Sequence, residues 1–509
     1  MSTFTVPLHA FAQHQTVLEL PPSHFTDRPS GLPVPNATEP FWIRHLGTDH
    51  IPALTEGSTG ELTHDADICI IGSGITGVST AYHLAQAVAG EGMKDSLKVV
   101  VLEAREFCQC ILPQVINGAH CSIGVGRNGG HLTPHGFAHF NALSQTFGVS
   151  EARRSLELEE YTTSQISRIL RETSKAEDVD FVSSGRVVLL FTKEDEEATR
   201  ADFEAAQAAG IDLSDVRWLT KEEVQTRYGT AYPAVIIPGN NVWPLKLVGH
   251  LYNLAQSTSP RLNLTLHTRT PVTSISPRSG DARNWTVNTP RGEIACTAVV
   301  HATNGYASHL LPFMHGEIIP TRGQVIAVRA AVPSPFGNGR EGFVGNEGFE
   351  YWFPRPKTSQ DKNANELVIL GGGREAAKDG KFEFYVTDDA NVNAQVGDVI
   401  RGFLPMVFPG KFDGKKEPEM EWTGIMGYTR SGEPFVWPLY VTGESANIGQ
   451  VYVGQYIAAG YTGHGMPRAF ACAEVIAAMV WADWKGEVWT APKWFPRHYL
   501  TTHKMHEMV

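Results

Sequence analysis

A glycine-rich hexapeptide stands between an apolar stretch and a helix-like stretch early in the chain. It consists of Gly72, Ser73, Gly74, Ile75, Thr76 and Gly77, with DICII before it at 67–71 and VSTAYHLAQAV after it at 78–88. In such a G-x-G-x-x-G pattern the first glycine permits a tight turn, the second lets the backbone approach a pyrophosphate, and the third lets helix and strand pack closely. The free N–H groups at the helix start favour bound phosphates. The motif predicts a dinucleotide site, with a ligand-free glycine turn as the alternative.

The next apolar stretch ends in a carboxylate. LKVVVLEA at 97–104 predicts a second buried strand, whose last residues are Glu103 and Ala104, followed by Arg105. A strand-end acid in this position can accept hydrogen bonds from a ribose diol, and its charge disfavours a 2′-phosphate. The strand–helix–strand order predicts a parallel sheet. FAD or NAD therefore fits better than NADP.

Two further glycine-rich segments favour FAD over NAD. GRNGGHLTP occupies 126–134, and GQYIAAGYTGHGM at 454–466 leads into the apolar helix RAFACAEVIAAMV. A strand, a glycine turn and a helix start can bring additional backbone amides to a large cofactor. An NAD-dependent dehydrogenase has no need of this second approach, and GGGRE at 371–375 lacks the helix that a second dinucleotide motif requires.

Composition excludes several classes of protein. Of 509 residues 42% are hydrophobic and 19% charged, which is ordinary for a globular chain of two packed domains. A net charge of -12 without a basic tract argues against nucleic-acid binding. The six cysteines form no CxxC pair, so no zinc site or dithiol is predicted. No basic–apolar leader and no long apolar run is visible, so we expect a soluble cytoplasmic protein that does not enter membranes.

The periodicity divides the chain into alternating blocks. Helical spacing occupies 151–175 and 193–210, strands dominate 182–238 and 318–430, and helices alternate with strands over 240–310. Phe41 and Trp42 are expected to pin an irregular arm to the body. The expected division is an N-terminal arm at 1–64, a cofactor-binding domain at 65–180, 240–317 and 431–509, and a substrate domain at 181–239 and 318–430.

In this order and spacing the motifs resemble the D-amino-acid oxidase/glycine oxidase/sarcosine oxidase superfamily, over roughly residues 65–485. GRNGGH points to the branch that includes gamma-glutamylputrescine oxidase-like proteins. The supporting motifs are IIGSGITG, VLEAR, GRNGGHLTP, VVHATNGYAS at 299–308, PTRGQV at 320–325, YWFPRP at 351–356 and GYTGHGM. The resemblance implies a mixed α/β fold, with a Rossmann-type FAD domain of the glutathione-reductase-like class interleaved with an antiparallel-sheet substrate domain.

The resemblance also implies where FAD is held. The ADP half would lie on the hexapeptide and the strand end, and the ring on the two later segments. The expected cofactor residues are Gly72, Gly74, Ile75, Thr76, Gly77, Glu103, Ala104, Arg105, Arg127, Asn128, Gly129, Gly130, His131, Thr303, Gly463, His464, Gly465 and Met466. His131 is a conceivable covalent attachment point, although a packed imidazole is the simpler interpretation.

Two departures from the family pattern bear on function. A stretch at about 109–120 (QCILPQVINGAH, with Cys110) is extra, and it is either a lineage-specific loop or a gene-model error. Sarcosine oxidase-like members carry a lysine for the substrate carboxylate just after the G-H-G turn, where this chain has Pro467, and another lysine near the flavin, where it has Ile369. A simple N-methyl amino acid is therefore a doubtful substrate, and oxygen as acceptor is an open question.

Hydride transfer from an amine to flavin asks the protein for orientation and exclusion of water, so no Ser/His/Asp triad or metal is expected. The candidate catalytic residues are Tyr351, Arg355, Arg374 and His464. Tyr351 and Trp352 alternate along a strand, so only one can face the pocket. An arginine can clamp a carboxylate, but a bridging salt bridge is an equal alternative for Arg355 and Arg374, and Tyr428 with Arg430 is a third possibility.

We expect an FAD-dependent enzyme that oxidises a C–N bond of a small amine or amino acid to an imine, with oxygen as acceptor and H2O2 as product. A dehydrogenase that uses another acceptor and a non-catalytic flavin-binding scaffold are the alternatives. An NAD(P)-dependent dehydrogenase fits least well, because the chain has one dinucleotide motif.

Overall fold

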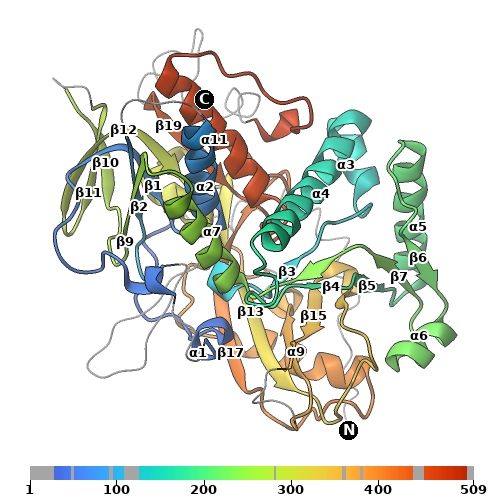
Figure 1. Ribbon diagram of the computed structural model, residues 1–509. Helices are drawn as coiled ribbons and strands as arrows, with labels where there is room; N and C mark the ends of the chain where they lie inside the picture. The colour runs from blue at the N-terminus through green and yellow to red at the C-terminus, as the bar shows by residue number, and fades with distance from the viewer. Residues whose placement is uncertain are drawn as a thin grey trace.

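The computed structural model describes residues 28–46, 51–90, 96–107, 125–279, 283–357, 363–378, 382–439 and 452–500 (Figure 1). The extra stretch at 109–120 lies outside the described residues, and so do the two chain ends. No described helix is long and apolar enough to cross a membrane.

The first sheet is built around parallel strands. Its order is β10 (Ser274–Pro277), β11 (Trp285–Thr289), β12 (Gly292–His301), β1 (Asp65–Ile71), β2 (Leu97–Leu102) and β9 (Leu262–His267). β19 (Gln455–Ala459) joins β12 in parallel and pairs on its other side with β18 (Phe435–Pro438). β1 lies parallel to both β2 and β12, and six of its seven residues are buried, as the apolar runs predict for a sheet covered on both faces.

Three helices pack side by side near this sheet. α2 (Ile75–Gly90) contacts both α7 (Pro244–Thr258) and α11 (Ala469–Lys485), as Figure 1 shows. α11 buries twelve residues, because it is apolar on nearly every side. The structure confirms four predicted elements, with ends that shift by a few residues. These are the strands that begin near 67 and 97, the helix that begins at 75, and the apolar helix over 468–480.

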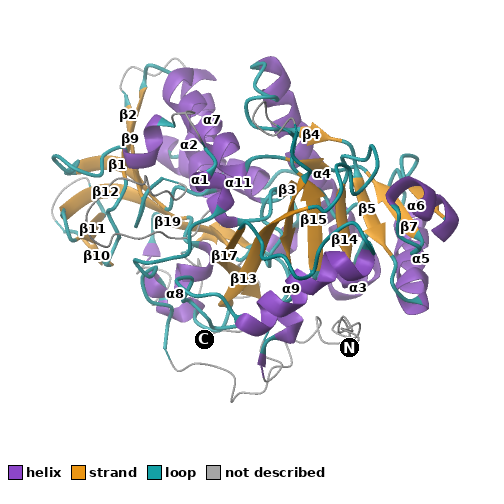
Figure 2. Cartoon of the chain, turned by 90° about the horizontal axis from the view of Figure 1, so that it is seen from below, coloured by secondary structure: helices purple, strands orange, loops and turns teal. Residues whose placement is uncertain are grey.

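The second sheet takes its strands from both blocks of the chain that were predicted to be rich in strands. Its order is β17 (Met420–Thr429), β13 (Ile318–Arg329), β16 (Leu367–Gly371), β15 (Glu350–Pro354), β14 (Gly342–Gly345), β5 (Arg186–Leu189), β7 (Ala234–Ile237) and β6 (Arg217–Leu219). All neighbours are antiparallel except β5 and β14. Figure 2 shows this sheet from below, with α9 (Ala394–Val407) against it.

Smaller elements connect the two sheets. β3 (His131–Leu132), β8 (Asn240–Asn241) and β4 (Val182–Ser183) form a three-stranded sheet, and α3 (Phe140–Phe147) packs on the long α4 (Val149–Glu172). α5 (Lys193–Ala208) and α6 (Lys221–Tyr228) each begin with a threonine capping box. The predicted mixed α/β fold is confirmed; its assignment to one dinucleotide-binding class and its division into interleaved domains stay predictions.

The N-terminal arm is anchored as predicted. Short helix α1 (Phe41–Arg44) inserts Trp42, which is fully buried, with its ring centroid 5.7 Å from that of Trp243. The indole N–H of Trp42 donates to the carbonyl of Asn128, 2.6 Å away, so the arm is tied to the second glycine-rich segment.

A buried histidine at the end of β12 makes stability depend on pH. His301 is fully buried beside Gln455, at 2.7 Å, and burial lowers its pKa from the ordinary 6.5 to about 4. Below pH 6.5 the unfolded chain takes up a proton at this histidine, whereas the folded protein does so only near pH 4. Acidification from pH 6.5 to about 4 therefore lowers the free energy of unfolding, which is unaffected by this residue at neutral pH. We expect His301 alone to remove about 3 kcal/mol of stability over that window.

Urea unfolding followed across this pH range measures the effect, and His301→Gln is the matched variant. The variant should lose less stability on acidification than the parent protein. Identical pH dependence in the two proteins would show that His301 is not protonated on unfolding.

Candidate functional site

The carboxyl ends of neighbouring parallel strands meet at one edge of the first sheet. β1 is followed directly by Gly72, β2 by Glu103, β12 by Ala302 and Thr303, and β19 by the turn 460–466. In open α/β sheets, ligands bind outside the carboxyl ends of the strands, where the connections diverge to the two sides. Segments that are far apart in the sequence therefore converge on one edge, and each was a predicted part of the cofactor site.

The hexapeptide turn needs its glycines. Gly72 has φ +108°, and a Cβ there would lie 2.7 Å from the carbonyl oxygen of Ala302. A Cβ at Gly77 would overlap the carbonyl oxygen of Gly72. Ile75 and Thr76 begin α2, and the Thr76 hydroxyl lies 3.0 Å from the phenol of Tyr461, which links this turn to the C-terminal turn.

Glu103 faces the hexapeptide turn. One carboxylate oxygen accepts from the backbone N–H of Ser73 at 2.9 Å and from its hydroxyl at 2.8 Å, and the other accepts from the N–H of Arg105 at 3.2 Å. Glu103 and Ala104 are partly exposed. Nearby, the Thr303 hydroxyl oxygen is buried without a hydrogen-bond partner among the described residues. These residues fit the ribose of a dinucleotide, because an acid and an unused hydroxyl adjoin a glycine turn, and the start of α2 beside that turn suits the phosphates.

Two predicted cofactor arginines make protein contacts. Arg127 is buried, its guanidinium donates to the carbonyls of Thr38 and Thr423, and it lies 3.7 Å from the buried carboxylate of Asp389. Arg105 reaches the same carboxylate at 3.4 Å. Asp389 therefore joins the arm, the hexapeptide side and the second sheet, a role that no sequence motif indicates.

The segment 128–131 lies against the second sheet. The Asn128 side chain accepts from the N–H of Gly130 at 2.8 Å, and a Cβ at Gly129 would overlap the ring of Tyr351. The His131 imidazole lies edge-on to Tyr351, with centroids 5.3 Å apart. Burial lowers the pKa of His131 to about 4, so the ring is neutral at pH 7. The structure brings Tyr351 to the predicted flavin segment, while Trp352 points into the core on the opposite face.

Arg374 and Tyr428 complete a cluster with Tyr351. The Arg374 guanidinium donates to the Tyr428 phenol at 2.7 Å and to the carbonyl of Phe382 at 3.3 Å, and it lies 4.8 Å from the Tyr428 ring centroid. Arg374 is 8% exposed, and no carboxylate of the described chain forms an ion pair with it. The neighbouring Glu375 carboxyl interacts with the Arg374 charge electrostatically but forms no ion pair with it. A buried guanidinium without an ion pair is costly, so this one is suited to an anionic ligand.

The same cluster touches the C-terminal turn. A Cβ at Gly463 would lie 2.7 Å from the Tyr428 phenol oxygen, and Gly463 has φ +77°. Gly465 accepts the first N–H bonds of α11, while Met466 is buried in the main core. Phe349, Phe384 and Met426, which the sequence did not single out, supply the apolar surroundings of Tyr428.

The structure separates the other candidates from this cluster. Arg355 forms an ion pair with Asp180, and its guanidinium lies over the rings of Trp42 and Trp243 at 5.1 and 4.8 Å. Its contacts are those of the bridging salt bridge, the alternative left open by the sequence. Arg430 donates to the carbonyl of Gly316 at 3.2 Å.

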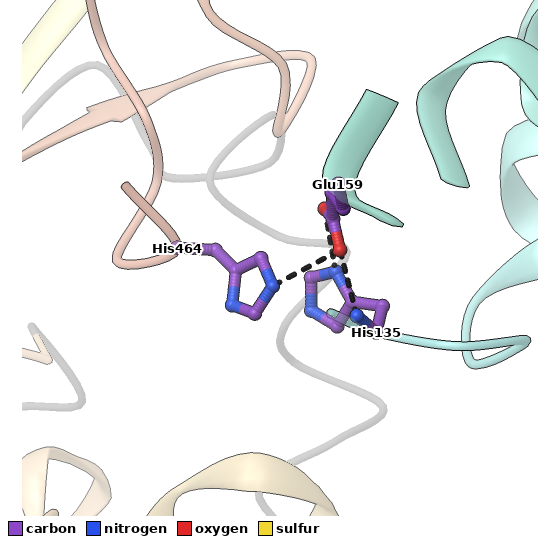
Figure 3. Close-up of side chains that lie close together, drawn as sticks. All are labelled: His135, Glu159 and His464. Carbon is purple, nitrogen blue, oxygen red and sulfur yellow. Dashed lines mark hydrogen bonds and ion pairs between the residues drawn. The ribbon is translucent and has the colours of Figure 1, made fainter. Parts of the chain in front are cut away.

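His464 belongs to a second cluster, drawn in Figure 3. Its Nε2 lies 3.2 Å from a carboxylate oxygen of Glu159, and its ring stacks on that of His135 with centroids 3.6 Å apart. The three side chains have the residue types of a metal site. However, a metal must lie in the plane of each imidazole that binds it, which stacked rings do not allow, and Arg468 already occupies the carboxylate at 2.7 Å. The geometry is that of a hydrogen-bonded cluster.

Comparison with known proteins shows the family to which the chain belongs. Residues 67–479 match the family model described as FAD dependent oxidoreductase (DAO). The chain is 24% identical over 433 residues to gamma-glutamylputrescine oxidoreductase of Escherichia coli strain K12, covering 82% of this chain and 84% of the relative. The fold is similar to that of glycine oxidase from Geobacillus kaustophilus (TM-score 0.59, 20% identity, 84% of this chain and 97% of that one). It is also similar to that of L-proline dehydrogenase from P. horikoshii (TM-score 0.59, 17% identity, 88% and 99%). Because the family model spans most of the chain, from the first buried strand to the last helix, the protein belongs to the DAO family of FAD-dependent oxidoreductases.

Proposed function

We propose that this protein binds FAD and oxidises the C–N bond of a small amine or amino acid that carries a carboxylate. The product is an imine, and with oxygen as acceptor the second product is H2O2. The names of the relatives support an amine-like substrate: one acts on gamma-glutamylputrescine, another is a glycine oxidase and a third an L-proline dehydrogenase.

The strand-end edge is the proposed cofactor site. The ADP half would be held by Gly72 to Gly77, Glu103 and Thr303. The ring would be held by residues 127–131 and 463–466. FAD, when bound, accepts a hydride from the substrate carbon. The chain itself supplies close backbone approach at Gly72 and Gly77, a ribose acceptor at Glu103 and an unused hydroxyl at Thr303.

The observation that carries the substrate proposal is the buried Arg374 without an ion pair. It adjoins Tyr428, which touches Gly463, and Tyr351, which touches Gly129, so it lies between the two segments proposed for the ring. A carboxylate would supply the missing counter-charge and fix the substrate in one orientation, while the apolar side chains around Tyr428 exclude water. Tyr351, whose pKa burial raises to about 12, stays protonated and can donate a hydrogen bond.

The electron acceptor has two candidates. Where the sarcosine oxidase-like pattern has lysines, this chain has Pro467 and the core residue Ile369, both buried. The absence of these two ammonium groups favours the second candidate, a dehydrogenase with a non-oxygen acceptor. We also propose the domain division given above, since β1, β2, β9, β12 and β19 share the first sheet and β13 to β17 share the second.

An anaerobic titration tests the function. We expect purified protein to carry visible flavin absorbance that bleaches on addition of one member of a panel of amines and amino acids, while the same amine without a carboxylate bleaches it far more weakly. Admission of air then distinguishes the two acceptors. Rapid recovery of the flavin absorbance with formation of H2O2 indicates an oxidase, and slow recovery indicates a dehydrogenase. Absence of flavin after reconstitution with FAD would refute the proposal, and flavin that no compound bleaches would leave a scaffold.

A further inference from the structure

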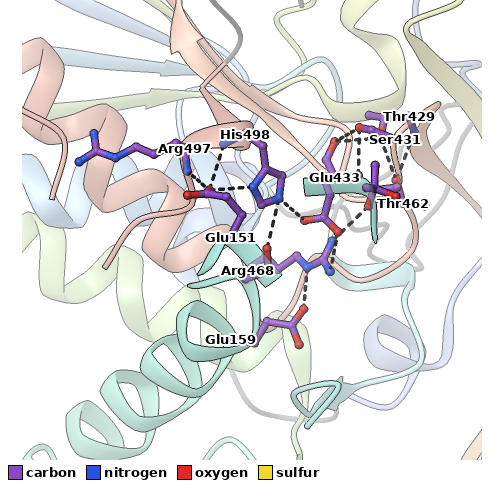
Figure 4. A network of polar contacts seen from close by, with 12 residues as sticks. Glu151, Glu159, Thr429, Ser431, Glu433, Thr462, Arg468, Arg497 and His498 are labelled. Carbon is purple, nitrogen blue, oxygen red and sulfur yellow. Dashed lines mark hydrogen bonds and ion pairs between the residues drawn. The ribbon is translucent and has the colours of Figure 1, made fainter. Parts of the chain in front are cut away.

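Glu159 gathers donors from three separate parts of the chain. It lies on the inner face of α4 and is fully buried. Its carboxylate accepts from the backbone N–H of His135 at 2.6 Å, contacts Nδ1 of His135 at 3.1 Å and Nε2 of His464 at 3.2 Å, and accepts from Nε of Arg468 at 2.7 Å (Figures 3 and 4). These partners belong to the segment after β3, to the turn 460–466 and to the start of α11. One side chain therefore ties the residues just after the proposed flavin segment 127–131 to the turn 460–466.

The carboxylate is ionised, and this fixes the hydrogens on both imidazoles. Burial alone would raise the pKa of Glu159, but His464, His135 and Arg468 together hold it well below its usual range. An ionised carboxylate can only accept hydrogen bonds, so the facing nitrogens, Nδ1 of His135 and Nε2 of His464, must carry the hydrogens.

Both rings stay neutral at pH 7. Burial, reinforced by the neighbouring His464, lowers the pKa of His135 to about 4, and burial also lowers the pKa of His464. In a neutral imidazole the nitrogen opposite the N–H is an acceptor. Nε2 of His135 and Nδ1 of His464 are therefore acceptors.

His135 and His464 lie beside the cluster of Arg374, Tyr428 and Tyr351, and both imidazoles are partly exposed to solvent. About one fifth of each side chain is exposed, 21% for His135 and 20% for His464. Gly463, which precedes His464, touches Tyr428. The two acceptor nitrogens therefore belong to rings at the border of the proposed flavin and substrate sites.

We propose that Glu159 is a positioning residue, which fixes His135 and His464 in the tautomers that offer hydrogen-bond acceptors to an N–H donor in the active site. The donor is a ring N–H of the flavin or the amino group of the substrate. The inference rests on the proposed function for the identity of the donor, but the tautomers are a property of the protein alone.

The first test measures the tautomers directly. ¹⁵N NMR of histidine-labelled protein, with His135→Gln and His464→Gln used to assign the signals, should find hydrogen on Nδ1 of His135 and on Nε2 of His464. The opposite tautomer at His464, or a charged ring at neutral pH, would overturn the proposal whether or not FAD or any substrate binds. A failure of the titration with amines would leave this result standing, so the two proposals fail separately.

The second test replaces the carboxylate by an amide. Each carboxylate oxygen of Glu159 contacts one imidazole nitrogen and one other donor. In Glu159→Gln the NH2 group therefore faces one imidazole N–H in either orientation, so at least one imidazole has to change tautomer or turn. We expect loss of one of the wild-type ¹⁵N signals and an effect of about tenfold on the bound N–H donor. A weaker FAD affinity with an altered visible spectrum assigns the donor to the flavin; an unaltered FAD complex with a raised substrate KM and nearly constant kcat assigns it to the substrate.

Glu433→Gln is the matched control. Glu433 is the other buried carboxylate beside Arg468, at 3.4 Å, and it contacts neither His135 nor His464 (Figure 4). If Glu159 merely neutralised Arg468, the two variants would behave alike, and that result would contradict the proposal. Glu159→Asp, which keeps the charge, should restore the wild-type tautomers; if Glu159→Gln does not fold, the wild-type tautomers and the His464→Gln variant still decide the question.

Discussion

Replacement of Arg374 by methionine is expected to lower kcat/KM for carboxylate-bearing amines by about a thousandfold. The guanidinium is buried, and the described chain gives it hydrogen bonds to Tyr428 and Phe382 but no ion pair. A substrate carboxylate that enters this site makes a desolvated, charge-assisted pair, and removal of one partner of such a pair costs about 3–5 kcal/mol. Each 1.36 kcal/mol corresponds to about a tenfold change in rate. Steady-state kinetics on a substrate identified by flavin bleaching measure the effect.

The same substitution should change the stability of the fold little. Arg374→Met breaks no ion pair and removes a buried charge, which offsets the loss of its hydrogen bonds to Tyr428 and Phe382, so the free energy of unfolding is expected to stay nearly constant. Arg355→Met is the contrast, since it strands the carboxylate of Asp180 and should lower stability. Arg430→Met is the kinetic control from the neighbouring β17 end. If Arg430→Met loses activity and Arg374→Met does not, the carboxylate site is elsewhere.

Contiguous residues made the first strand, turn and helix of the parallel sheet predictable. The strand, turn and helix around Gly72 to Gly77 are encoded within about 25 residues, where burial, glycine conformation and helical spacing all point to the same local structure. The later glycine-rich segments were predicted to bring further backbone amides to the same cofactor. Parallel strands bring their carboxyl ends to one edge, so pairing of β1 with β12 and of β12 with β19 was enough to assemble the edge.

The sequence could not decide whether Arg355 or Arg374 lies at the substrate site, because the difference depends on contacts with distant residues. Arg355 and Arg374 both follow apolar strands in the sequence. Their difference depends on Asp180, which lies 175 positions before Arg355, and on the register that sets Tyr351 opposite Gly371. Strand alternation predicted that Tyr351 and Trp352 would face opposite sides, but it could not say which of them would face the site.

Glu159 and His135 were missed although the sequence holds a signal for one of them. The buried positions of α4 include Ala152, Leu156, Glu159, Thr163 and Ile166, spaced three or four apart. An acid on the apolar stripe of a charged helix must find buried partners, and that requirement marks Glu159 as unusual. The partners themselves come from segments before and far after the helix, so the stripe alone could not name His135 or His464.

Gly77→Ala is expected to abolish flavin binding, whereas Gly90→Ala on the same helix leaves it intact. A Cβ at Gly77 would overlap the carbonyl oxygen of Gly72, a backbone atom that no rotamer change can move away. The helix start must therefore withdraw from the turn, and the N–H groups that face the phosphates move with it. At Gly90 nothing lies within 4 Å of the added carbon, and α2 ends there, so the substitution costs nothing.

The ratio of flavin absorbance to protein absorbance after reconstitution measures this difference, and thermal unfolding of both variants without added FAD separates lost binding from lost folding. We expect the dissociation constant for FAD to rise at least about a hundredfold in Gly77→Ala, because a displacement of one backbone turn removes several phosphate hydrogen bonds of about 1.5–3 kcal/mol each. Unchanged FAD affinity in a folded Gly77→Ala protein would mean that the cofactor does not use this turn, and the strand-end site proposed here would have to be given up.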